Sequence, residues 1–274
     1  MMQKNISVVI STYNSTEWLR KVIWGYNTQT CRNFEMVIAD DGSGQETFDL
    51  IEQMKKEVFF PIIHIWHEDN GFQKSQILNK AIVGCTTAYI LMSDGDCIPR
   101  PDFIEQHIKF REEGYFLSGG YHKLPLLLSE NITKEDIYSG KCFELKWLKS
   151  NGMKVSFKNS KVYSDGLVST VLNFLTPTTP SWNGHNASGW KEDILAINGF
   201  DERMQYGGQD RELGERLINY GIKSKQIRYS TVCLHLDHPR GYATPDSISK
   251  NKNIRKQTQE QLKKWTDFGI LKKQ

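Results

Sequence analysis

The sequence lacks paired cysteines. Its five cysteines, at 31, 85, 97, 142 and 233, form no CxxC pair and have no regular spacing. This argues against a zinc module and against a disulfide framework. We therefore expect reduced thiols and a cytoplasmic protein.

Long apolar runs are also lacking. No segment of the 274 residues approaches the roughly 18 apolar residues that a membrane span needs, and the first apolar stretch is too short for a signal peptide. Any membrane contact is expected to be peripheral, at the inner face of the cell membrane. The lysine-rich stretch 141–161, with Trp147 and Phe157 interleaved, is either a solvated face or a membrane-surface patch, and we favour the solvated face.

An excess of one charge is missing as well. The formal net charge is +3, and lysine and arginine are dispersed up to about residue 141, so no nucleic-acid partner is expected. Neither GxGxxG nor GxxxxGK[ST] occurs, which disfavours a dinucleotide-binding fold and a P-loop.

Strand and helix patterns alternate in the first half. Continuous apolar runs predict buried strands, and helical spacing of apolar residues follows each of the first three. This order is typical of an α/β fold with a mostly parallel sheet and helices on both faces. The predicted strands are 6–10, 34–39, 61–66 and 88–92, and the predicted helices begin near 16, 45, 74 and 101, with Pro101 as the first residue of the last.

The second half is less regular. We predict a variable insertion at 121–180, with strand-like pieces and a capping box at Thr133–Asp136. A short helix stopped by Gly199, a helix after Gly208 and a strand over 226–236 follow. The predicted units are 1–120, 121–180 (insertion), 181–245 and 246–274 (basic helical tail).

Polar residues follow every predicted strand of the first half, where an open parallel sheet binds its ligand. The fourth strand runs into Asp94 and Asp96. A turn explains Asp and Gly there, but the position favours carboxylates that hold a divalent cation, whose shell phosphates and waters complete. A nucleotide diphosphate is the partner that this chemistry suits.

Asp40 and Asp41 end the second strand, beside the first strand's Ser11, Tyr13 and Asn14. An Asx turn explains two acids in DDGS. The neighbouring tyrosine favours a nucleotide base lying between its ring and one carboxylate.

Asp210 follows Gly207, Gly208 and Gln209 at the start of a predicted helix. An acid at a helix N-terminus stabilises the helix dipole, yet two glycines also allow a substrate to approach the backbone. We favour a catalytic role for Asp210.

Two histidines, His235 and His238, lie at the end of the late strand, and His235 is the better candidate to join Asp96 on a metal. A mixed oxygen and imidazole set suits Mn²⁺ better than Ca²⁺. Aromatic rings and amides gather at Trp182, His185, Asn186 and Trp190, where contact with a sugar ring and simple core packing are equally supported.

In this order, VVISTYN, VIADDGSG, NGFQKSQILNKAI, SDGDCIPRPDF, INGFDE and GGQDREL closely resemble the family 2 inverting glycosyltransferases of the GT-A fold, with a galactosyltransferase-type later half. The resemblance implies nucleotide contacts, metal ligands and a catalytic base. The nucleotide contacts are Ser11, Tyr13, Asp41 and Lys74, with Asp40 adjacent; the DxD motif is Asp94 and Asp96; the metal histidine is His235; and the base is Asp210. Tyr206 and Gln209 stand where the family's WGGED motif has tryptophan and glutamate, which leaves sugar specificity open.

The expected activity is metal-dependent (Mn²⁺ or Mg²⁺) inverting transfer of a hexose or N-acetylhexosamine, galactose-type, from a UDP-sugar to a glycan hydroxyl. The expected setting is bacterial polysaccharide or lipopolysaccharide synthesis, with a lipid-linked glycan as one form of acceptor. An inactive sugar-nucleotide-binding protein and a sugar-nucleotide hydrolase remain alternatives.

Overall fold

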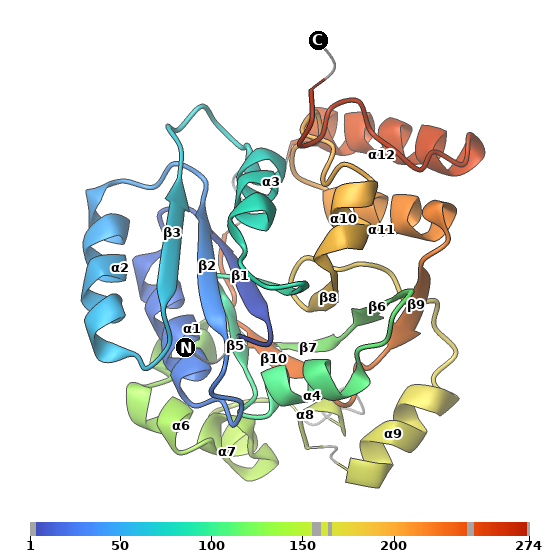
Figure 1. Cartoon of the computed structure of the whole chain (residues 1–274). Coiled ribbons are helices and arrows are strands. Elements are labelled where there is room, and N and C mark those ends of the chain that lie inside the picture. Colours follow the sequence, from blue (N-terminus) through green and yellow to red (C-terminus); the bar gives the residue numbers. More distant parts are fainter. Residues whose placement is uncertain (1–3, 155–159, 164–165, 240–243, 273–274) are drawn as a thin grey trace.

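Four parallel strands form one side of a central sheet in the computed structural model, which describes residues 4–154, 160–163, 166–239 and 244–272 (Figure 1). The sheet has seven strands in the order β3-β2-β1-β4-β8-β6-β9. Strand β8 runs antiparallel to β4 and β6. The strands are β1 (Ser7–Thr12), β2 (Glu35–Asp40), β3 (Ile62–Trp66), β4 (Tyr89–Asp94), β6 (Tyr115–Ser118), β8 (Ala187–Trp190) and β9 (Lys223–Gln226). The predicted α/β class with a mostly parallel sheet is confirmed.

Helices cover both faces of this sheet because its strands are apolar on both sides (Figure 1). Successive residues of a strand point to opposite faces, so Val8 and Val9 belong to two separate buried clusters. One cluster includes helices α1 (Thr16–Asn27), α2 (Gln45–Glu57) and α4 (Phe103–Phe110). The other includes α3 (Lys74–Gly84), α10 (Lys191–Ala196) and α11 (Gln209–Tyr220).

A second, three-stranded sheet has the order β5-β10-β7. It consists of β5 (Cys97–Pro99), β10 (Val232–His235) and β7 (Gly120–Lys123). Strand β10 pairs antiparallel with β5, so that His235 lies opposite Cys97. This pairing brings the late histidine to the DxD segment.

Three sequence predictions are corrected here. Strand 226–236 is two strands in different sheets, because the chain turns at 227–231, where the N–H groups of Ser230 and Thr231 both bond to Ile227 O. Pro101 lies in the turn before α4, and the helix begins at Phe103. Helix α10 ends at Ala196, before Gly199.

The segment between β7 and β8 is helical rather than strand-like. The capping box is confirmed, since Asp136 N donates to Thr133 Oγ1 (3.2 Å) and Thr133 N donates to Asp136 Oδ2 (3.1 Å). Leu128, Ile137 and Leu148 belong to the core cluster that includes α1. The local sequence pattern does not show that these residues pack against a distant helix. Phe157 lies outside the described residues. The helices are α5 (Leu126–Asn131), α6 (Lys134–Tyr138), η1 (Lys141–Phe143), α7 (Leu145–Ser150), α8 (Ser160–Tyr163) and α9 (Gly166–Leu175).

The C-terminal segment forms helix α12 (Pro245–Glu260), which packs against α11. Thr258 Oγ1 donates to the buried carboxylate of Glu212 (2.9 Å), which also holds Arg216. Across the described ranges, no helix combines the length and the apolar character needed to cross a membrane.

Candidate functional site

Two adjoining cavities open at the carboxyl ends of the parallel strands. Their volumes are about 720 Å³ and 580 Å³. They share four lining residues: Lys74, Asp94, Tyr206 and Gln209. The larger is called the donor cavity and the smaller the acceptor cavity from here on, after the roles that are proposed for them below.

Asp41 lines the donor cavity, as do Tyr13 and Asn14. The Asp41 carboxylate accepts hydrogen bonds from His67 Nε2 (2.8 Å) and Gln73 N (3.0 Å). Burial raises the pKa of Asp41, and the His67 hydrogen bond partly opposes this shift. The Tyr13 side chain is 48% exposed, so its ring is available to a ligand.

Asp40 does not lie in either cavity. Its carboxylate accepts from Ser43 N (2.9 Å) and bonds to His64 Nε2 (2.9 Å). Since neighbouring strand residues point to opposite faces, only one of the two acids can face the cavity. The prediction that Asp40 contacts the nucleotide is therefore dropped.

Asp94 forms a compact cluster with Lys74 and Ser11. Its Oδ1 accepts from Lys74 Nζ (2.6 Å) and from Ser11 Oγ (2.9 Å). Burial alone would raise the pKa of Asp94, but the Lys74 charge prevails and lowers it. Asp94 is thus held ionised between the two cavities, with Lys74 as its counter-ion.

Asp96 faces two histidines at the other side of the donor cavity. His238 Nε2 lies 2.7 Å and His235 Nε2 lies 3.8 Å from Asp96 Oδ2. Each Nδ1 donates to a backbone carbonyl, of Leu236 (2.9 Å) and of Pro239 (2.8 Å). Because a carbonyl only accepts, Nδ1 carries a proton in both rings, and Nε2 is the atom left on the side of Asp96. A cation between Asp96 and the rings would take the Nε2 lone pairs and replace the direct contacts. This donor set fits a divalent cation such as Mn²⁺.

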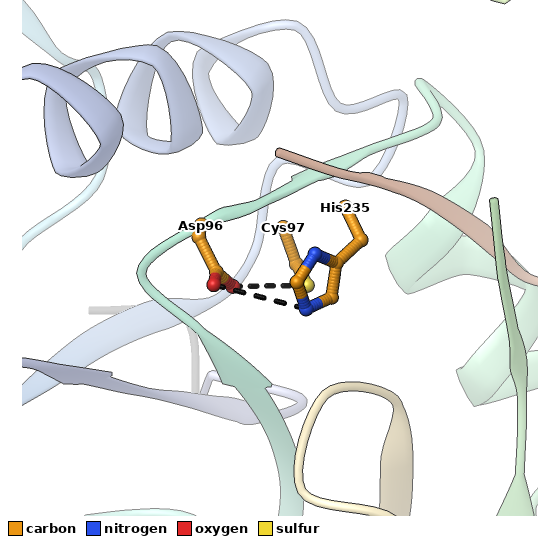
Figure 2. A group of neighbouring side chains, drawn as sticks. All are labelled: Asp96, Cys97 and His235. Carbon is orange, nitrogen blue, oxygen red and sulfur yellow. Dashed lines mark hydrogen bonds and ion pairs between the residues drawn. The ribbon is translucent and has the colours of Figure 1, made fainter. Parts of the chain in front are cut away.

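Cys97 lies beside Asp96 and His235 (Figure 2), and one donor atom of each residue lies within 4.8 Å of the others. Its Sγ donates to Asp96 Oδ1 (3.4 Å). Burial raises the pKa of the Cys97 thiol well above its usual value, so the protonated form is the stable one. The two imidazoles are therefore better partners than Cys97 for a cation on Asp96.

Asp210 lies at the first turn of α11 and lines the acceptor cavity. Its carboxylate accepts from Gly184 N (3.0 Å) and Arg211 N (2.8 Å). Gly207 and Gly208 precede it with φ values of +111° and +88°, a region that favours glycine. Gln209 is nearly buried and accepts from Gly207 N (3.1 Å).

His185 also lines the acceptor cavity and packs edge-on against Tyr121, with ring centroids 4.5 Å apart. Burial lowers the pKa of His185, although the Asp94 charge acts in the opposite direction. A neutral imidazole at neutral pH follows from this. Of the four residues predicted to contact a sugar ring, His185 alone lines either cavity.

The other three predicted sugar contacts are wrong. Trp182 is fully buried and packs against Phe116. Asn186 is also fully buried, and its amide group is used by His107, Gly120 and Thr231. Trp190 pairs with Tyr89 at the amino end of β4, because β8 is antiparallel, and this is the edge of the sheet opposite to the cavities.

Sequence reasoning missed the contribution of α12 to the site. Ile248, Lys252 and Arg255 of this helix line the acceptor cavity. The lysine-rich tail is predicted as a separate unit. Its residues Ile248, Lys252 and Arg255 are four and three residues apart, a spacing that places them on one face of a helix. This spacing is the sequence signal for a surface that they share. Trp18, from α1, was also missed in the donor cavity.

A mostly parallel sheet with an acidic pair at the end of its fourth strand, facing late histidines and a helix-terminal aspartate, is the arrangement of a GT-A glycosyltransferase. The model of glycosyl transferase family 2 matches residues 7–125 of the chain.

Relatives and solved structures agree with this match to a glycosyltransferase family. The chain is 26% identical to the uncharacterized glycosyltransferase YfnE of Bacillus subtilis (strain 168), over 89% of this chain and 68% of the relative. It is 23% identical to chondroitin synthase of Escherichia coli, over 93% of this chain and 38% of the relative. The chain thus spans less than half the length of the second protein.

Two solved structures share the fold. The mannosyltransferase PcManGT from Pyrobaculum calidifontis, in complex with GDP-Man and Mn²⁺, has a TM-score of 0.60 and 16% identity, over 88% of this chain and 59% of that chain. S. aureus TarS in complex with UDP-GlcNAc has a TM-score of 0.60 and 14% identity, over 92% of this chain and 65% of that chain.

Proposed function

We propose that the chain transfers a hexose or N-acetylhexosamine from a UDP-sugar to a hydroxyl of a glycan acceptor, with inversion at the anomeric carbon. The observation that carries this proposal is the joining of the two cavities at Lys74, Asp94, Tyr206 and Gln209. A donor sugar at this junction would have the diphosphate near Asp96 and the acceptor near Asp210. Residues 1–120 are then the donor half and 181–245 the acceptor half, with 121–180 as an insertion.

The nucleotide is proposed to lie in the donor cavity, with its base beside Tyr13 and Asp41. Ser11, Asn14 and Lys74 complete this side of the cavity. The UDP-GlcNAc complex of TarS supports a UDP-sugar, while the GDP-Man complex of PcManGT is the counter-example that the test must address. A galactose-type sugar rests on the motif resemblance alone.

The proposed cation is Mn²⁺ or Mg²⁺, held by Asp96 with His235 and His238, while Asp94 acts directly or through water. When bound, such a cation would supply positive charge at the donor diphosphate, which would make UDP a better leaving group. The chain's own part is to orient both imidazoles through backbone carbonyls. Lys74 can in addition meet a phosphate oxygen from the shared wall of the cavities.

Asp210 is the proposed general base. Gly184 N and Arg211 N hold its carboxylate at the wall of the acceptor cavity. It takes the proton from the acceptor hydroxyl, whose oxygen bonds to the anomeric carbon as the bond from that carbon to the UDP oxygen breaks. This single displacement inverts the centre and needs no covalent intermediate.

The proposed acceptor is a growing glycan of a bacterial polysaccharide or lipopolysaccharide, used at the inner face of the membrane through a peripheral contact. Helix α9 supports this contact. It turns Ser169 and Asn173 towards Ser230 of the body (3.2 Å and 2.8 Å), and leaves Leu167 and Phe174 84% and 89% exposed. A helix with its apolar side outward suits contact with the surface of a bilayer. Residues 141–154 contain four lysines and one glutamate, and this positive charge favours a bilayer of anionic lipids.

The test is UDP release from a panel of UDP- and GDP-sugars with Mn²⁺ and a glycan acceptor library. Asp210→Asn should reduce transfer by about 10²- to 10⁴-fold and leave UDP affinity unchanged. Asp49→Asn, on the exposed surface of α2, is the matched control.

Three outcomes would contradict parts of the proposal. UDP release that needs no acceptor means a hydrolase, and nucleotide binding without release means an inactive binding protein. Loss of UDP binding in Asp210→Asn assigns a structural role to this aspartate.

A further inference from the structure

The acceptor cavity is basic, although the donor cavity beside it is acidic. Four cations line the acceptor cavity (Lys74, Arg211, Lys252 and Arg255), against two carboxylates, Asp94 and Asp210. The donor cavity has Asp41, Asp94 and Asp96 against Lys74 alone. The two ends of the site therefore attract ligands of opposite charge.

Two of the four cations have no acidic partner among the described residues. Lys74 pairs with Asp94 (2.6 Å), and Arg255 pairs with Glu215. Arg211 and Lys252 are exposed and form no ion pair within the part of the chain that the structure describes. The neighbouring Gln209 is neutral, so it does not offset their charge.

Helix α12 holds Lys252 at a fixed place beside the glycine loop. Asn251 Nδ2 donates to Gln205 O (2.8 Å) and Gly207 O (3.1 Å), and Ser247 Oγ donates to Tyr206 O (3.3 Å). Asn251 and Ser247 are buried. The lysine is therefore attached to the same loop that sets the start of α11, where Asp210 and Arg211 follow one another.

We infer that the acceptor carries a phosphate or carboxylate group, which Arg211 and Lys252 bind while its hydroxyl lies at Asp210. A guanidinium matches the planar oxygen pair of either anion, and an ammonium adds a point charge. The inference rests on the proposed function, because it takes the acceptor cavity to be the place of the acceptor. It goes beyond that function by assigning a negative charge to the acceptor and by naming the two residues that bind the charged group.

The experiment measures binding of three matched probes to the full chain saturated with UDP and Mn²⁺. The probes are methyl β-glucoside, methyl β-glucuronoside and methyl β-glucoside 6-phosphate. The two acidic probes are expected to bind at least about tenfold more tightly than the neutral one, as for a charge-assisted hydrogen bond. Tighter binding of the phosphate than of the carboxylate assigns a phosphorylated acceptor, and the reverse order an acidic sugar.

The combined variant Arg211→Gln and Lys252→Gln should abolish the preference for acidic probes and leave the UDP affinity within about twofold. Lys250→Gln with Lys256→Gln removes the same charge from exposed positions of α12 outside the cavity, and should keep the preference. Equal binding of acidic and neutral probes by the wild type, or a preference that survives the first variant, overturns the inference.

A fall in UDP affinity in the first variant also overturns it, because the two cations would then serve the donor diphosphate. Binding rather than turnover is read, so the result does not depend on Asp210 acting as a base. Failure of the proposed function appears separately, as absence of UDP release.

Discussion

At the scale of single residues, a buried polar chain joins the two sheets beneath the site. The Asn186 amide group donates to Gly120 O (2.7 Å) and Thr231 O (3.1 Å), which fixes its oxygen as the acceptor for His107 Nε2 (2.8 Å). His107 Nδ1 then accepts from Ser188 Oγ (2.7 Å). Every partner is satisfied only while His107 is neutral, so protonation of this residue should disrupt the chain.

His107 should make the protein less stable in acid. Burial lowers its pKa from 6.5 to about 3, despite the hydrogen bond to Asn186. The unfolded chain binds the proton more readily than the folded chain between these values, so stability falls as pH falls through this window. The free energy of unfolding should be about 2 kcal/mol lower at pH 5 than at pH 7 from this residue.

Urea unfolding of wild type and His107→Gln at pH 5 and pH 7 tests this expectation. Glutamine keeps a hydrogen-bond donor near Asn186 but does not titrate. The difference in unfolding free energy between pH 7 and pH 5 should therefore be about 2 kcal/mol smaller in the variant than in the wild type. The same pH difference in both proteins would show that other groups cause the acid sensitivity.

The two histidines at Asp96 should both matter for the cation. His235→Ala and His238→Ala should each lower the Mn²⁺ affinity by about tenfold or more, measured by titration of free Mn²⁺ in the presence of UDP. His64→Gln is the matched control, since His64 bonds to Asp40 outside the cavities. An unchanged affinity in His235→Ala would leave the role to His238, whose Nε2 is the closer of the two to Asp96.

At the scale of elements, local patterns predicted the first half well because each pattern there agrees with its final packing. Helix α3 (Lys74–Gly84) begins where it is predicted to begin, and Ile77, Ala81 and Ile82 lie on its buried face. The region after residue 120 failed for the opposite reason. Helix α6 packs against α1, and α5, η1 and α7 contribute residues to the same buried cluster, so contacts with distant elements decide their conformation.

The site residues also divide into those that the local sequence pattern places at the cavities and those whose position depends on distant elements. The strand ends of the parallel sheet placed Asp41, Asp94 and Asp96 correctly at the cavities. The direction of β8 could not be read from the sequence, and it moves Trp190 to the opposite edge. The burial of Trp182 depends on Phe116 and on the α11 helix at Gly214, which lie far from it in the sequence.

Helix α9 should determine the proposed membrane contact. Leu167→Ser with Phe174→Ser removes the two most exposed apolar side chains of this helix without touching Ser169 or Asn173, which hold it to the body. Sedimentation with vesicles of phosphatidylglycerol and phosphatidylcholine should fall several-fold in this variant, because each leucine- or phenylalanine-sized side chain contributes about 1.5–3 kcal/mol on burial.

Val83→Ser, at an exposed position of α3 (55%), is the control for α9 and should sediment like the wild type. If the wild type sedimented equally well with vesicles of pure phosphatidylcholine, the lysines would have no role in the membrane contact. A dimer in solution that the α9 variant dissociates would instead make this helix an interface between copies of the chain.

At the scale of the whole molecule, the proposed donor site exists only in the folded chain. Asp41 follows β2, Asp96 follows β4 and His235 ends β10, in the second sheet. Residues this far apart in sequence have no fixed arrangement in the unfolded chain, so UDP and a cation should bind the native state alone. Ligand binding must then stabilise the fold by mass action.

The thermal midpoint should rise by roughly 5–10 °C when UDP with Mn²⁺, taken as one ligand, is present at about 100 times its dissociation constant, which corresponds to about 2.7 kcal/mol. UDP alone should give a smaller shift, because its diphosphate would face Asp94 and Asp96 without a cation between them. Asp96→Asn should remove the additional shift that Mn²⁺ causes and keep the shift that UDP causes through Tyr13 and Asp41. A full shift with UDP alone, in wild type and variant alike, would mean that Lys74 neutralises the diphosphate and that the site works without a metal.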